Sequence, residues 1–67
     1  MKIILNNNPE VLEVNACTVS DLLRIRNFTF KMLIVKINGK LVRKDEFGTA
    51  EIHDGDNVSV LHLISGG

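Results

Sequence analysis

Few side chains in this sequence have the type and spacing that catalysis or metal binding requires. Cys17, His53 and His62 are the only soft metal ligands, and they do not stand in pairs at the short spacing of a zinc site. Residues 54–56, Asp-Gly-Asp, have the composition of a tight turn rather than of a pair of acid–base carboxylates. We therefore expect no bound metal and no carboxylate-based active site.

Conventional catalysis is equally poorly supported. No glycine-rich loop stands between a strand and a helix, so the sequence lacks a phosphate-binding cradle. His62 falls within a predicted strand without a second catalytic group at a defined spacing, and Cys17, just before a predicted helix, is of a residue type that is commonly buried. The sequence therefore predicts a protein that is not itself an enzyme and binds no cofactor.

The last residues of the sequence, Ser65, Gly66 and Gly67, offer chemistry of another kind. A Gly-Gly end arises by chance in roughly 0.5% of chains, and its ordinary explanation is a frayed terminus. Because glycine has no Cβ, such a tail can also thread a narrow channel in a partner enzyme. The Gly67 carboxylate, with a pKa of about 3.5, is ionised at neutral pH and able to attack the α-phosphate of ATP.

The apolar pattern predicts several strands that position this tail. Residues 6–9 and 38–39 read as turns, and residues 43–52 as irregular with one helical turn near 45–47. The predicted strands are 2–6, 10–14, 32–37, 41–42 and 57–64.

One main helix is predicted between the second and third strands. Thr18 and Asp21 have the spacing of a capping box, and Val19, Leu22 and Leu23 form one apolar stripe. The helix should end near Asn27.

This order of elements predicts an α+β, ubiquitin-like β-grasp fold. A mixed sheet of four or five strands carries the helix across one face, with the last strand central and parallel to the first. We expect residues 1–64 to form the domain and residues 65–67 a flexible tail. The predicted core contains Val19, Leu22, Leu23, Val35, Ile37, Val58 and Val60.

Three apolar residues should lie on strand faces opposite this core. Ile4, Leu61 and Leu63 could meet on adjacent strands and form a partner-binding patch, because exposed apolar patches commonly mark interaction sites. Coverage by loops or by self-association remains the alternative.

Composition limits the remaining possibilities. The chain has 67 residues, 45% of them hydrophobic, which indicates one globular domain. No apolar run approaches the ~20 residues of a membrane span, and the N-terminus lacks a signal-peptide pattern, so we expect a cytoplasmic protein.

The charges are unevenly distributed along the chain. Residues 24–44 contain only basic charges and residues 45–67 only acidic ones, a distribution that serves either solubility or the steering of a partner. Nucleic-acid binding is not favoured, since the chain has three Phe and no Trp or Tyr.

Short motifs along the whole chain resemble the ThiS family of sulfur carriers in thiamine biosynthesis. Residues 42–47 match the family only in part, because Arg43, Lys44 and Phe47 stand where it often has Pro, Arg and Trp. The matching stretches are Thr18-Val19-x-Asp21-Leu22-Leu23, Val35-x-Ile37-Asn38-Gly39, Val42 with Lys44 and Phe47, Asp54-Gly55-Asp56-x-Val58, and Ile64-Ser65-Gly66-Gly67.

The resemblance implies that Gly67 is adenylated by a ubiquitin-activating-type adenylyltransferase, which uses ATP, and is then converted to a thiocarboxylate. Thiazole synthase would receive the sulfur, and the free carrier would be a monomer. Three alternatives remain open: a carrier of the molybdopterin-synthase small-subunit type, a ubiquitin-like modifier conjugated through Gly67, and a non-covalent β-grasp interaction module.

Overall fold

In the computed structural model, which describes residues 1–29 and 32–63, the chain begins with a hairpin of β1 (Lys2–Leu5) and β2 (Asn8–Val11). Asn6 and Asn7 both have positive φ, 50° and 68°, as a two-residue hairpin turn requires. The second strand therefore begins earlier than the predicted 10–14. Pro9, predicted as a turn residue, lies within β2, where an edge position tolerates its missing N–H.

Helix α1 (Val19–Ile25) begins at the predicted capping box. The Asp21 amide donates to Thr18 Oγ1 at 3.1 Å, and the Thr18 amide donates to Asp21 Oδ2 at 3.2 Å. At the other end Asn27 adopts φ 63°, while the Phe28 and Asn27 amides donate to the carbonyls of Leu23 and Arg24. These two bonds form a Schellman motif, which ends the helix at the predicted place.

The second half of the chain supplies the rest of the main sheet. Strands β4 (Leu33–Ile37) and β5 (Lys40–Val42) form a hairpin across Asn38 and Gly39, both with positive φ. A 3-10 helix, η1 (Lys44–Glu46), provides the helical turn predicted in this region. Strand β7 (Asn57–His62) ends the described secondary structure.

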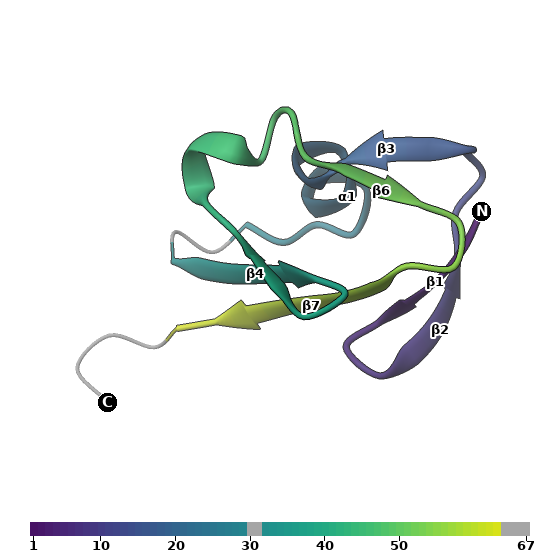
Figure 1. Cartoon of the computed structure of the whole chain (residues 1–67), viewed down its shortest axis with the longest axis horizontal. Helices are drawn as coiled ribbons and strands as arrows, with labels where there is room; N and C mark the ends of the chain where they lie inside the picture. Colours follow the sequence, from purple (N-terminus) through teal and green to yellow (C-terminus); the bar gives the residue numbers. More distant parts are fainter. Residues whose placement is uncertain (30–31, 64–67) are drawn as a thin grey trace.

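The main sheet has the strand order β2-β1-β7-β4-β5. Strand β7 pairs with β1 in parallel and with β4 in antiparallel orientation, so the last strand is central, as predicted. The Asn6 side chain extends the parallel ladder, because its Oδ1 accepts from the Val60 amide at 2.8 Å. The protein has the ubiquitin-like β-grasp fold, and Figure 1 shows α1 lying over the sheet.

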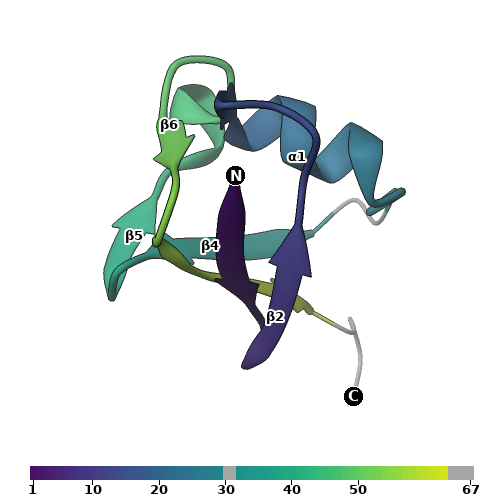
Figure 2. The ribbon, with the colours of Figure 1, turned by 90° about the vertical axis from the view of Figure 1, so that its right-hand side faces the viewer.

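A second, two-stranded sheet was not predicted. Strands β3 (Ala16–Thr18) and β6 (Glu51–His53) pair in antiparallel orientation and place Cys17 opposite Ile52, both buried. Figure 2 shows β6 and α1 on the same side of the main sheet. Residues 51–53 alternate polar and apolar side chains, but three residues are too few for a reliable strand signal.

The core lies between the main sheet and the layer that α1, β3 and β6 form. Five of the seven predicted core residues are buried, and Leu23 and Ile37 are half-buried against them. The buried residues are Ile3, Leu5, Leu12, Cys17, Val19, Leu22, Val35, Ile52, Val58 and Val60.

Leu22 is fully buried at the centre of this core, so truncating it should destabilise the whole domain. We expect Leu22→Ala to lower the free energy of unfolding by about 2–5 kcal/mol, measured by urea denaturation. Leu41→Ala is the matched control, since Leu41 is 61% exposed, and should change it by no more than about 0.5 kcal/mol. Equal losses in both variants would show that the core is wrongly assigned.

The capping box should make stability depend on pH. The pKa of Asp21 lies below its ordinary 3.8, first because the Thr18 amide donates to its carboxylate, then because of the Thr18 side chain and Arg24. A lowered pKa stabilises the fold above the unfolded-state value, and this contribution is lost as the pH falls through the folded-state pKa. Asp21→Asn should therefore be less stable than wild type at pH 7, and the difference should shrink below about pH 4.

Urea denaturation at several pH values measures this effect, with Ser20→Ala on the same helix as the control. A stability difference between wild type and Asp21→Asn that stays constant from pH 7 to pH 2 would contradict the assigned role of the carboxylate.

Candidate functional site

The structure positions the base of the predicted tail. Ser65, Gly66 and Gly67 themselves lie outside the described residues. Leu63 follows the central strand β7, and its amide donates to the Met32 carbonyl at 3.0 Å. This bond holds the segment just before the tail against the beginning of β4.

The predicted patch lies partly on the sheet face that faces away from α1. Ile4 is aligned with Asn57, whereas Leu61 lies four residues further along β7, roughly 13 Å away. Ile4 is half-buried and Leu61 is 53% exposed. The two residues therefore share one face of the sheet, but the register does not make them neighbours.

Two apolar residues that the sequence interpretation did not select lie closer to Leu61. Ile34 is the direct cross-strand partner of Leu61, and Leu41 is the partner of Lys36 on the same face. Two signals in the sequence could have identified them. Residues 33–37 alternate strictly between the two faces of a strand, and the turn at residues 38–39 sets the register of the strand that follows. The exposed face near the tail thus consists of Leu61, Ile34 and Leu41 around Lys36, and we call it the sheet patch.

Leu63 is placed differently from Leu61. It lies beyond the last residue of β7, is 43% exposed, and lines a pocket between α1, the beginning of β4 and η1. The alternation that predicted a shared face for these two leucines holds only as far as the strand continues.

Cys17 is part of the core rather than of a reactive site. It is buried in β3 opposite Ile52, and burial raises the pKa of its thiol above the ordinary 9.0, with a further contribution from the negative charge of Asp21. A raised pKa keeps the thiol protonated and unreactive at neutral pH.

The remaining polar residues of interest have structural partners. The turn predicted at residues 54–56 is present, and Asp56 accepts from the His53 amide and from the Asn38 side chain. His53 Nε2 lies 3.1 Å from Glu51 Oε1 on the surface of β6. Within residues 1–29 and 32–63, His, Cys, Asp and Glu side chains nowhere gather in threes as metal ligands. The same residues include no helix with the length and hydropathy of a membrane crossing.

The fold, with its central last strand leading to a C-terminal segment and an exposed apolar sheet face beside it, defines a ubiquitin-like β-grasp protein. The model of the ThiS family matches residues 3–67, and the chain belongs to this family. Members of the family are small sulfur carriers in thiamine biosynthesis, and act as carriers rather than as catalysts.

Solved structures support this assignment. The chain is similar to the thiamine biosynthesis protein (ThiS) from Geobacter metallireducens in its crystal structure, with a TM-score of 0.90, 25% identity and full coverage of both chains. The solution structure of a thiamine biosynthesis protein from the same organism matches with a TM-score of 0.81 and 25% identity, over all of this chain and 88% of the other.

Leu61 provides a direct test of the sheet patch. Leu61→Asp should weaken binding of a partner enzyme of thiamine biosynthesis by at least about tenfold in calorimetry, because it places a charge in an apolar contact. The fold should persist, since the side chain is half-exposed. Val11→Asp is the matched control, because Val11 is 68% exposed on the edge strand β2, and should bind like wild type. Unchanged affinity in folded Leu61→Asp would remove the sheet patch from the interface.

Proposed function

We propose that this sulfur carrier bears its sulfur as a thiocarboxylate on Gly67. The observation that carries the proposal is that the family match runs through residue 67 and so includes the Gly66-Gly67 pair. Ser65 and Gly66 supply a segment narrow enough to enter the active site of a partner enzyme, because glycine has no Cβ and serine has only a small side chain.

The proposed reaction has two steps. A Gly67 carboxylate oxygen attacks the α-phosphorus of ATP, pyrophosphate leaves, and an acyl-adenylate forms. Hydrosulfide delivered by the partner then attacks the carbonyl carbon, AMP leaves with the electrons of the broken C–O bond, and the Gly67 thiocarboxylate forms on loss of the sulfur-bound proton. Phosphate binding and charge stabilisation belong to the partner, a ubiquitin-activating-type adenylyltransferase.

The described residues are consistent with this division of labour. Cys17, the one thiol of the chain, is buried with a raised pKa, which disfavours a carrier that holds sulfur on cysteine. The sheet patch lies beside the base of the tail, where a partner that acts on Gly67 has to bind.

Thiazole synthase is the acceptor that we propose for the sulfur. The matching structures are named as thiamine biosynthesis proteins, which favours this pathway over molybdopterin synthesis or conjugation to protein lysines. ATP is supplied in the cytoplasm, which we propose as the compartment of the reaction, with the free carrier a monomer.

The tail variants test the proposal. In a protein that ends at Gly67, deleting Gly67 or adding one residue after it should abolish ATP-dependent activation and leave the unfolding midpoint unchanged. Gly66→Val should reduce activation less completely, because a β-branched side chain widens the tail and restricts its backbone. Intact mass after incubation with ATP, the adenylating enzyme and a sulfur source measures the replacement of one oxygen by sulfur.

Cys17→Ser is the control for the position of the sulfur. It should be thiolated like wild type at a temperature at which circular dichroism shows it folded. Full activation of the tail variants together with an inactive, folded Cys17→Ser would establish a cysteine-based carrier instead.

A further inference from the structure

An open pocket of about 490 Å³ lies at the end of the molecule where β4 begins and β7 ends. Its walls include Leu23 from α1, Phe28 after the helix, Leu33 of β4 and Phe47 after η1. All four side chains are half-buried and pack against the core. The pocket is therefore a continuation of the core that residues 1–29 and 32–63 leave open.

Two features of the fold create this opening. Helix α1 has seven residues and spans about 10 Å, whereas the six residues of β7 span about 20 Å, so the helix covers only part of the sheet. The Schellman motif then turns the chain at Asn27 and brings Phe28 back towards Leu23, through the Phe28 N–H to Leu23 carbonyl bond of 2.8 Å. The end of the helix therefore shapes one side of the pocket.

The pocket has a cation at its wall. Lys44, in the first turn of η1, lines it together with Thr29. The neighbouring charges are matched locally, since Arg43 pairs with Asp45 at 3.1 Å and Arg24 with Asp21 at 3.1 Å. Across residues 1–29 and 32–63, no side-chain hydrogen bond or ion pair involves the Lys44 ammonium group.

An apolar cavity with one unmatched cation is complementary to an apolar group that carries a carboxylate nearby. The cavity volume lies within the range of sites that take ligands of side-chain or drug size, about 300–1,000 Å³. The aliphatic stem of lysine can lie along such a wall while its ammonium group meets the anion.

We propose that this pocket is a second docking site for the adenylating enzyme, which inserts a large apolar side chain flanked by Asp or Glu. The proposal rests on the proposed function, because an enzyme that acts on Gly67 must bind beside the base of the tail. Leu63, the last described residue before the tail, itself lines the pocket, and its amide is bonded to the carbonyl of Met32, another lining residue. The pocket and the sheet patch thus lie on two sides of the tail base.

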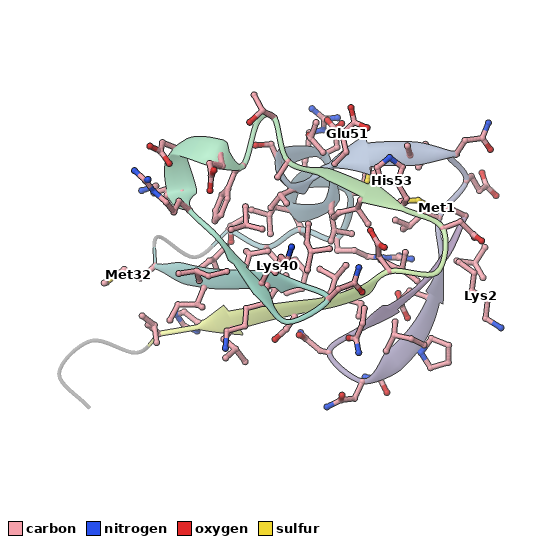
Figure 3. The ribbon with its side chains drawn as sticks, in the orientation of Figure 1. Met1, Lys2, Met32, Lys40, Glu51 and His53 are labelled. Carbon is pink, nitrogen blue, oxygen red and sulfur yellow. The ribbon has the colours of Figure 1, made fainter. Side chains whose placement is uncertain are left out.

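The chain offers well-matched variants for this pocket. Met32, labelled in Figure 3, lies at the beginning of β4 and is 54% exposed, so Met32→Ser removes part of the apolar wall without opening the core. Lys44→Glu reverses the charge. Lys40→Glu is the control, because Lys40 is exposed at the turn end of the β4–β5 hairpin, away from the pocket.

The first experiment needs no enzyme and uses 4-phenylbutyrate as the probe, with 4-phenylbutylamine as its cationic counterpart. Titration followed by amide chemical shifts in NMR should move the signals of Leu23, Phe28, Leu33 and Phe47 with phenylbutyrate, and much less with the amine. Lys44→Glu should reverse this preference, and Lys40→Glu should retain it. Absence of pocket shifts with phenylbutyrate, or equal shifts with both probes, would overturn the proposed ligand chemistry.

The second experiment measures ATP-dependent adenylation of the carrier. Lys44→Glu and Met32→Ser should raise KM for the carrier by about three- to tenfold and leave kcat within twofold of wild type, because docking and not chemistry is impaired. Lys40→Glu should behave like wild type. Unchanged KM in both pocket variants, while wild type is activated, would overturn this proposal and leave the proposed function intact. Failure of the wild type to be activated would overturn the proposed function, and the docking site with it.

Sedimentation velocity of the free protein and NMR of a variant lacking residues 64–67 test the other occupants. If the protein forms concentration-dependent dimers that Met32→Ser abolishes, the occupant of the pocket is a second copy. If deleting residues 64–67 shifts the NMR signals of the pocket residues, the occupant is the chain's own end. A monomer with unchanged pocket signals supports the enzyme as the occupant.

Discussion

Strand β7 is hydrogen-bonded on both sides, by β1 in parallel and by β4 in antiparallel orientation, and the rest of the structure depends on this double pairing. It joins the first described strand to the last, so the centre of the main sheet depends on contacts between segments far apart in the chain. Asn6 strengthens the junction, because its side chain takes the place of a backbone carbonyl for the Val60 amide. The same pairing places the end of β7 beside the beginning of β4, which fixes where the C-terminal segment departs.

The small size of the domain explains why its surfaces remain partly apolar. A short helix and a two-stranded sheet cover one face of the main sheet, and for residues 1–29 and 32–63 Figures 1 and 2 show no helix on the other face. The apolar residues Ile34, Leu41 and Leu61 therefore remain on that face. Beside α1, apolar residues that line the pocket remain only half-buried. Exposed apolar surface of this kind commonly marks an interaction site.

Cys17 contributes to the packing of the core, and its burial makes its thiol a poor reactive group. Its side chain is buried in the hydrophobic core, where a reactive thiolate would be costly because of burial and the nearby Asp21 carboxylate. A reactive group outside the hydrophobic core avoids this conflict, because it can react without disturbing the packing around Cys17.

The sequence by itself determined the features that arise from local interactions. The capping box at Thr18 and Asp21, the helix end at Asn27 and the turn at residues 38–39 involve neighbours, so residue type and spacing were sufficient to predict them. Tertiary structure alone decided which residues meet across the fold. The β3–β6 pair, the placement of Leu61 beside Ile34 rather than Ile4, and the pocket at Leu63 depend on register between segments far apart in the chain, which local pattern does not encode.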